Sequence, residues 1–151
     1  ITAVSAVING GTLYKPYIVK RIVEPNSNEI IKEFKPQKIK QVISEKTSET
    51  VRSVLETVVA YGTGRNAYIE GYRVGGKTGT AQKVNNGIYM KGNYILSFIG
   101  FLPADKPQAV VYVAIDNPKG VTQYGGTVSA PIAKNIMIDI IDKLKIRNTY
   151  I

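Results

Sequence analysis

The clearest chemical pattern in this sequence lies at residues 71–78, Gly-Tyr-Arg-Val-Gly-Gly-Lys-Thr. The run fits the spacing G-x-x-x-x-G-K-[ST], in which backbone N–H groups surround phosphates and the lysine reaches the β and γ oxygens. Residues 110–115 form an apolar run followed by Asp116, a type of segment that supplies a magnesium ligand in such proteins. A P-loop nucleotide-binding protein that uses Gly71 to Thr78 is therefore one hypothesis.

The neighbouring residues argue against that hypothesis. A P-loop follows a strand and opens a helix at its Lys-Thr pair. Here Gly79 comes next, and the Asn85-Asn86-Gly87 cluster predicts a turn that would stop any helix within two turns. The two strands predicted after it are joined by five residues, too few for a parallel crossover. The P-loop is kept as the alternative.

The same residues also contain the tetrapeptide Lys77-Thr78-Gly79-Thr80. Lys-Thr-Gly is a motif of penicillin-binding proteins and class A β-lactamases. Four segments extend the pattern: residues 74–82 (Val-Gly-Gly-Lys-Thr-Gly-Thr-Ala-Gln), 97–104 (Ser-Phe-Ile-Gly-Phe-Leu-Pro-Ala), 6–11 (Ala-Val-Ile-Asn-Gly-Gly), and Gly125-Gly126 with Ala130-Pro131. Through these segments the chain resembles the C-terminal half of the transpeptidase domain of a class B penicillin-binding protein, of the division or sporulation-specific type. Class A β-lactamases resemble it less, because Ala81-Gln82 and the segments that follow it have the transpeptidase pattern.

This resemblance assigns catalytic roles to Lys77 and Thr80. Lys77 would be a second cation beside the nucleophile, where it would tune proton transfer and attract the substrate carboxylate. Thr80 would supply a backbone N–H to the oxyanion hole, and losing one such donor typically lowers the rate by ~10²–10³-fold. The ordinary alternative for Lys77 is a solvated surface lysine.

Three more residues would bind substrate in the same family. Thr78 would offer its hydroxyl to the terminal carboxylate of the stem peptide or of a β-lactam. Gly79 would keep the strand edge bare, so that substrate backbone can pair with it as an added strand. Gln82 would lie further along the same face of the strand, at the period of two. The ordinary alternatives are a β-branched strand residue for Thr78 and a bulge for Gly79.

Two residue types are missing from the chain, histidine and cysteine. Their absence excludes Ser-His-Asp and Cys-His nucleophiles, zinc sites built on Cys or His, and disulfides. A general base must then be Lys, Asp, Glu or Tyr. A serine activated by lysine, as the resemblance implies, needs neither missing type. We expect no metal and no organic cofactor.

The family's other two motifs, Ser-x-x-Lys and Ser-x-Asn, follow none of the seven serines. We therefore expect residues 1–151 to be an incomplete, C-terminal portion of a transpeptidase domain. The nucleophilic serine would lie outside this chain, and the chain alone would be inactive and would not be labelled by penicillin.

The apolar periodicity predicts an α+β fold with an antiparallel sheet packed by helices. We expect strands at 72–83, 94–102 and 109–115, covered by a helix at 128–144 with Pro131 in its first turn. A helix end at 2–9, a hairpin with strands at 17–24 and 29–34, and a helix at 45–61 capped by Ser44 would precede them. Residues 35–43 look like a surface connection.

The chain is basic, with a formal net charge of +9. The charge is spread along the sequence without a run, so we expect a solvated surface and no nucleic acid partner. The resemblance implies as partners the peptidoglycan stem peptide, β-lactam antibiotics and a cell-wall glycosyltransferase or division complex. It places the full-length protein at the extracytoplasmic face of the cell membrane, anchored by a segment not in this chain. A non-catalytic basic module that binds anionic wall polymer is a further alternative.

The last predicted strand, at 109–115, would form an edge of the sheet. It contains neither Pro nor Lys to protect its unpaired backbone groups. We therefore expect the chain to self-associate along this strand.

Overall fold

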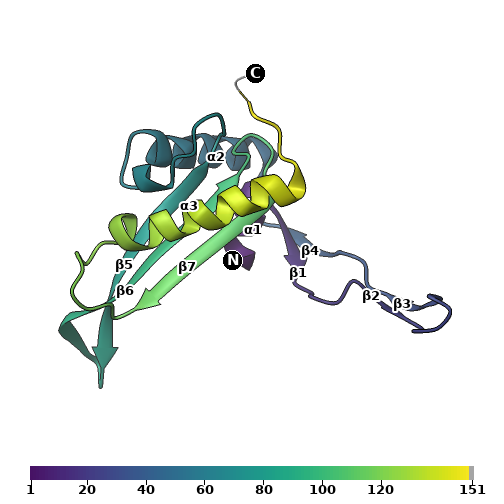
Figure 1. Ribbon diagram of the computed structural model, residues 1–151, viewed down its shortest axis with the longest axis horizontal. Helices are drawn as coiled ribbons and strands as arrows, with labels where there is room; N and C mark the ends of the chain where they lie inside the picture. The colour runs from purple at the N-terminus through teal and green to yellow at the C-terminus, as the bar shows by residue number, and fades with distance from the viewer. Residues whose placement is uncertain (150–151) are drawn as a thin grey trace.

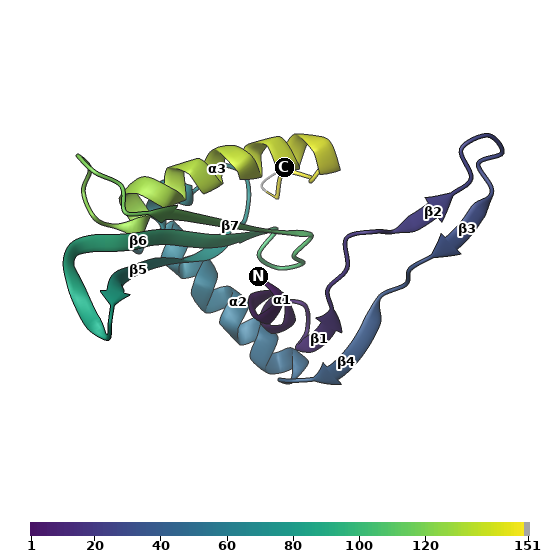
Figure 2. The same cartoon turned by 90° about the horizontal axis from the view of Figure 1, so that it is seen from below.

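The body of the molecule is a three-stranded antiparallel sheet with helices on both faces (Figures 1 and 2). The structure is a computed structural model and describes residues 1–149. The sheet contains β5 (Gly75–Asn85), β6 (Ile88–Leu102) and β7 (Ala109–Asp116), in the order β5-β6-β7. Helix α3 (Gly125–Leu144) covers one face, while α1 (Thr2–Ile8) and α2 (Glu45–Ala60) lie toward the other. The α+β prediction and the three sheet strands are confirmed, but β6 begins at Ile88, six residues before the predicted start at 94.

Strand β6 carries the core on both of its faces. Successive side chains of a strand point to opposite faces. On one face Phe98 is fully buried in a cluster that includes Ala133 and Met137 of α3. On the other face the equally buried Phe101 belongs to a cluster that includes Ile8 of α1. The sheet therefore holds α1 and α3 in place through two phenylalanines of a single strand, three positions apart.

Helix α2 begins as the sequence predicts. The Ser44 hydroxyl accepts a hydrogen bond from the Thr47 N–H at 3.1 Å and so caps the helix. A short 3₁₀ turn, η1 (Arg65–Ala67), follows and leads into β5. Among residues 1–149, no helix combines the length and apolar character needed to cross a bilayer.

Helix α3 begins three residues before the predicted start at 128, and this changes the place of Pro131. The proline lies inside the helix and not in its first turn, so the Thr127 carbonyl lacks the usual intrahelical donor. The sequence obscured this start because Gly125 and Gly126 have poor helix propensity. These glycines allow the first turn to lie directly against the sheet.

Residues 12–41 leave the body as a long ribbon, which we call the arm (Figure 2). Near the body, β1 (Thr12–Lys15) pairs with β4 (Gln37–Gln41). Further out, β2 (Arg21–Val23) pairs with β3 (Ile30–Glu33) around the predicted turn. The hairpin is confirmed, but its strands are shorter than 17–24 and 29–34. The prediction that 35–43 is only a connection is wrong, because Gln37–Gln41 is a strand. All five residues of that strand are exposed, so its sequence lacks the alternation of apolar and polar residues by which a half-buried strand is predicted.

Candidate functional site

The Lys77-Thr78-Gly79-Thr80 motif lies in the middle of β5, the outer strand of the sheet. Within residues 1–149, β5 pairs with β6 on one side and with no strand on the other. The strand continues without a break to Asn85, so no helix opens at Lys77. The P-loop alternative is therefore wrong, because its phosphate-binding geometry requires that helix.

The strand register divides the predicted site residues between the two faces of β5. Thr78 lies opposite Phe98 and Thr80 opposite Leu96, on the face that α3 covers. Gln82 lies opposite Tyr94 and so follows on the same face, as predicted. Lys77 and Gly79 lie opposite Ile99 and Ser97, on the other face. The motif therefore surrounds an open strand edge with a cation on one side and hydroxyls on the other.

A threonine that the sequence analysis did not single out joins these hydroxyls. The Thr63 and Thr78 hydroxyl oxygens lie 3.1 Å apart, within hydrogen-bond distance. Thr63 stands in the loop after α2, fifteen residues before Thr78. A lone Thr in a Gly-Thr-Gly loop gives no sequence signal of its own, and only the fold brings it to β5.

The first turn of α3 lies directly behind the motif. The Gly125 N–H donates a hydrogen bond to the Thr80 hydroxyl at 3.3 Å. A Cβ on Gly125 would stand 2.3 Å from the Ser97 carbonyl oxygen and 2.5 Å from that of Gly79, so a glycine is needed here. The Asn66 side-chain amide donates to the Gly126 carbonyl at 2.8 Å and holds the same turn. The positive end of the α3 dipole thus faces Thr78 and Thr80, where it favours an anion.

Gly79 has a local packing role in addition to the one predicted for it. A Cβ at this position would stand 2.4 Å from the Ser97 hydroxyl oxygen of β6. Any larger residue would therefore move Ser97 or separate β5 from β6. The predicted role, a bare edge for substrate backbone, concerns the same atoms and stays a prediction.

The charged groups near β5 differ in how they are engaged. The Lys83 ammonium forms an ion pair with the Asp116 carboxylate at 2.7 Å, so the Asp of the P-loop hypothesis is already paired. Lys77 is exposed, and its ammonium donates to the Thr78 carbonyl at 3.2 Å. Among residues 1–149 Lys77 forms no ion pair. Its charge is therefore available to a ligand at the strand edge.

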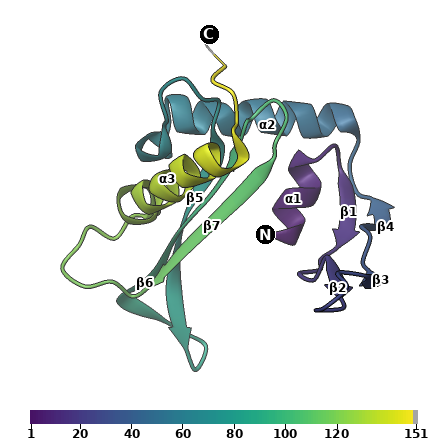
Figure 3. The same ribbon diagram turned by 45° about the vertical axis from the view of Figure 1, so that its right-hand side comes forward.

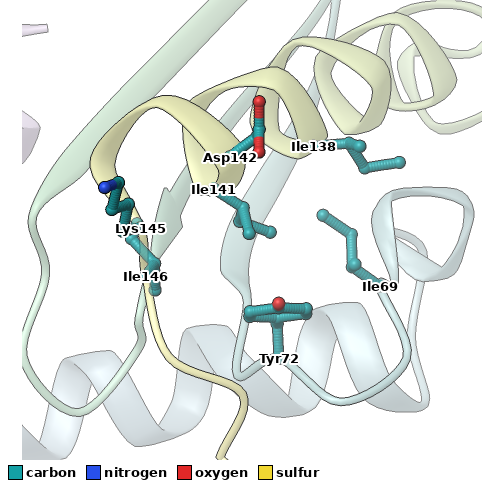
Figure 4. A pocket seen from close by; sticks show the side chains of 7 residues that line it. All are labelled: Ile69, Tyr72, Ile138, Ile141, Asp142, Lys145 and Ile146. Carbon is teal, nitrogen blue, oxygen red and sulfur yellow. The ribbon is translucent and has the colours of Figure 1, made fainter.

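A hollow elsewhere on the surface is not part of this site (Figure 4). It lies beside the C-terminal turns of α3, with Ile141 and Ile146 on one side and Ile69 and Tyr72 on the other. The helix has twenty residues, so its two ends stand about 30 Å apart. The motif lies at the N-terminal end of α3, far from this hollow.

Comparison with protein families gives one match, to the penicillin binding protein transpeptidase domain, over residues 1–138. Stage V sporulation protein D of Bacillus subtilis is 60% identical over 147 residues, which are 97% of this chain and 23% of that protein. A peptidoglycan D,D-transpeptidase FtsI homolog of Chlorokybus atmophyticus is 40% identical over 73% of this chain and 16% of its own length. The chain thus spans less than a quarter of these relatives.

Solved structures give the same result. Penicillin binding protein 3 of Mycobacterium tuberculosis, in complex with ampicillin, superimposes with a TM-score of 0.85 at 31% sequence identity. The match covers 99% of this chain and 35% of that one. The likeness therefore extends over the sheet, its helices and the arm.

Proposed function

The chain belongs to the penicillin-binding protein transpeptidase domain family, and on this premise we propose that it is the C-terminal portion of a peptidoglycan D,D-transpeptidase. In this proposal the complete protein cross-links stem peptides by serine acyl transfer and is acylated by β-lactams. Residues 1–151 contribute the Lys-Thr-Gly strand and its supports, and the nucleophilic serine belongs to another part of the domain. The observation that carries the proposal is the position of Lys77-Thr78-Gly79-Thr80 on the open edge of β5.

The chemistry proceeds in two transfers. The serine oxygen bonds to the carbonyl carbon of the penultimate D-Ala, and the terminal D-Ala leaves with the serine proton. An amine of a neighbouring stem peptide then attacks the acyl-serine, which restores the serine and completes the cross-link. A β-lactam enters the same first step and stays attached.

The residues of this chain bind and orient the acyl donor in that scheme. The substrate backbone pairs with the free edge of β5, as an added strand does. The terminal carboxylate meets the Thr78 hydroxyl, and the N-terminal end of α3 behind it favours the negative charge. Gln82 contacts the donor further along this face. The Thr80 N–H belongs to the oxyanion hole, where it stabilises the negative charge that develops on the carbonyl oxygen.

Lys77 acts from the other face of β5. Its ammonium, which forms no ion pair among residues 1–149, raises the positive potential at the strand edge and so stabilises the developing anion. The same potential assists proton transfer by the lysine of the Ser-x-x-Lys motif, which lies outside this chain. Thr63 is a positioning residue in this proposal, because its hydroxyl lies 3.1 Å from that of Thr78 and orients it.

The partners and the location follow from the same proposal. The complete protein would act at the extracytoplasmic face of the cell membrane, anchored outside these residues, together with a glycosyltransferase that makes the glycan strands. A role in sporulation agrees with the name of the Bacillus subtilis relative, stage V sporulation protein D, and a division role is kept as the alternative.

The rate of acylation by fluorescent penicillin tests the proposal in the protein that contains the nucleophile. We expect Lys77→Ala to lower the second-order rate constant by ~10²-fold or more, the scale for losing an electrostatic group at such a site. Lys91→Ala, at an exposed lysine of the β5–β6 hairpin, is the control and should leave the rate unchanged. A Lys77→Ala rate within a factor of two of the wild type would contradict the role of Lys77.

A pair of variants at Thr63 separates positioning from structure. Thr63→Val should slow acylation while Thr63→Ser restores it, since only the serine keeps the hydroxyl next to Thr78.

The isolated chain tests where the nucleophile lies. Residues 1–151 alone should show no adduct with penicillin that survives boiling. A stoichiometric adduct on this chain would mean that a nucleophile lies within it.

A further inference from the structure

The arm, residues 12–41, has features of a docking surface, and they are independent of the proposed function. It projects from the body on the side opposite the β5–β6 turn, and its outer end stands apart from the sheet and from α3 (Figures 2 and 3). Every residue of β2, β3 and β4 is exposed. Large aliphatic side chains are among them: Ile18 is fully exposed, and Ile31 is 65% exposed. The arm thus holds apolar groups in solvent instead of using them for a core.

The backbone of the arm is also unsatisfied along its edges. Each arm strand pairs with one other strand only among residues 1–149, so each has one free edge. A two-stranded ribbon is marginally stable in water, and a third strand that covers an apolar face adds the stability it lacks. The arm therefore provides both unpaired N–H and C=O groups and uncovered side chains to a further strand.

The charges of the arm are divided between its stem and its tip. The arm contains seven cationic and three acidic residues (Lys15, Lys20, Arg21, Lys32, Lys35, Lys38 and Lys40; Glu24, Glu29 and Glu33). Two of the acids flank the turn at the tip. The Glu24 carboxylate is engaged there, since it accepts hydrogen bonds from the Asn26 and Ser27 N–H groups at 2.6 and 2.8 Å. Within residues 1–149, none of the seven cations forms an ion pair.

Three of the seven cations line a hollow where the two ribbons of the arm meet. This hollow of about 470 Å³ is lined by three lysines, two aromatic rings and one carboxylate (Lys15, Lys32, Lys35; Tyr17, Phe34; Glu33), together with Pro16 and Gln37. The Lys32 ammonium lies 4.9 Å from the centre of the Phe34 ring. The site combines positive charge with apolar contact area, which suits a chain that alternates carboxylates and apolar side chains.

We propose that the arm binds an acidic, extended segment of a partner protein, which pairs with the free edge of β3. Its carboxylates meet Lys32 on one face of β3, and its alternate apolar side chains cover Ile31 on the other face. Lys35, just beyond the end of β3, adds positive charge at the hollow. This mode of binding takes its affinity from main-chain hydrogen bonds and its specificity from alternate side chains.

Two other kinds of occupant fit the arm less well. A hairpin that enters a membrane needs an apolar tip, whereas this tip is a polar turn between Glu24 and Glu29. A wall polyanion would satisfy the lysines but leave the exposed Ile and Val side chains in water. Both become outcomes of the test.

The test measures fluorescence anisotropy of a labelled decapeptide of alternating Glu and Val, titrated with the purified protein. We expect saturable binding that weakens with salt, and no binding of a matched peptide of alternating Lys and Val. The double variant Lys32→Glu/Lys35→Glu should weaken binding at least tenfold. The matched control Lys91→Glu/Lys143→Glu makes the same charge change at exposed positions outside the arm and should change nothing.

Hydrogen exchange locates the contact. Amides of residues 30–35 should become protected when the Glu-Val peptide is added, and acylation by penicillin should be unaffected by the arm variant. Equal binding by the double variant would overturn the proposal. So would tighter binding of polyglycerol phosphate or of phosphatidylglycerol vesicles than of the peptide. The amides of residues 30–35 could also be as protected as those of β6 before any peptide is added. That result would mean that the protein itself covers the arm, and it would overturn the proposal.

Discussion

The β5–β6 hairpin and the β2–β3 hairpin are built by the same local rules and differ in everything around them. Both turn at residues with positive φ, Asn86 and Gly87 in one and Asn28 in the other. The first hairpin lies between helices and buries Phe98 and Phe101, whereas the second has no buried residue in either strand. Local sequence therefore makes a hairpin, and its surroundings decide whether its side chains form a core or a surface.

This contrast has a functional side. The body holds its motif strand with close contacts from α3, β6 and the loop that follows α2, so its polar groups are fixed before any ligand arrives. Among the described residues 1–149, the arm is held to the body at its base, where the Gln41 side chain donates to the Gly10 and Ile43 carbonyls. A preorganised site suits catalysis, and an uncovered ribbon suits association.

Truncating one apolar residue in each hairpin should show the largest difference. We expect Phe98→Ala to lower the free energy of unfolding by about 3–5 kcal/mol, because it leaves a cavity between the sheet and α3. Ile31→Ala, at a side chain 65% exposed, should change it by less than about 0.5 kcal/mol. Urea unfolding followed by circular dichroism measures both. Similar losses for the two variants would contradict the division into core and surface.

A single added methyl at the start of α3 should have the next largest effect. Gly125→Ala places a Cβ 2.3 Å from the Ser97 carbonyl oxygen, and relief of this overlap should cost about 1–3 kcal/mol. Thr127→Ala, at an exposed position in the same turn, is the matched control. Because α3 would also move away from Thr80, we expect Gly125→Ala to slow acylation in the complete protein, with Thr127→Ala near the wild-type rate.

The two regions should also differ in self-association. Strand β7 has a free edge with no Lys or Pro, and the arm edges carry several lysines, which oppose pairing between copies. We expect dimers of residues 1–151 at micromolar concentration, with about 1,200–2,000 Å² of buried surface along β7. Val111 faces the core at 7% exposure and is unsuitable as a probe, so Tyr112→Lys, at 50% exposure, tests the edge. A 16.5 kDa monomer by light scattering, unchanged by Tyr112→Lys, would contradict this expectation.

The smallest effect should be a local pH dependence at the tip of the arm. Hydrogen bonds from the Ser27 and Asn26 N–H groups hold the pKa of the exposed Glu24 carboxyl below its ordinary 4.5. The contribution of these bonds is therefore present above pH 4.5 and is lost as pH falls through the lowered pKa. The Ser27 amide resonance should titrate with a midpoint below 4.5, and Glu24→Gln should abolish that titration. A midpoint at or above 4.5 would mean that the turn does not depend on the carboxylate.

How much of this the sequence could predict depends on whether a segment buries a face. Strands β5 and β7 and helix α2 carry apolar periodicity, and they appear close to where the pattern places them. Strand β6 ends where predicted but begins six residues early, at Ile88, because its first residues pair with β5 without burying a face. Strand β4 alternates Lys, Ile and Gln with every residue exposed, so nothing in its pattern distinguishes a strand from a connection. The early start of α3 could not be predicted, because Gly125 has poor helix propensity. A glycine is needed there since the first turn of α3 lies close to the backbone of β6.

The candidate site was predictable to a similar degree. Lys77, Thr78, Gly79 and Thr80 were singled out because they are contiguous, and Gln82 because it lies two positions further on. The strand register confirms that Thr80 and Gln82 share a face with Thr78, and the roles of all five residues stay predictions. Thr63 comes from a different element, and its approach to Thr78 depends on where α2 ends relative to β5. Contacts of that kind arise from tertiary packing and leave no spacing in the sequence.

The short turn between β5 and β6 has a consequence for the order of folding. Only two residues separate these strands, so their contacts close small loops, and contacts between residues near in sequence form quickly. Helix α3 must instead return over 45 residues to place Gly125 against Thr80. The motif strand is thus expected to acquire its register early, while the hydroxyl and helix contacts that complete the site form late.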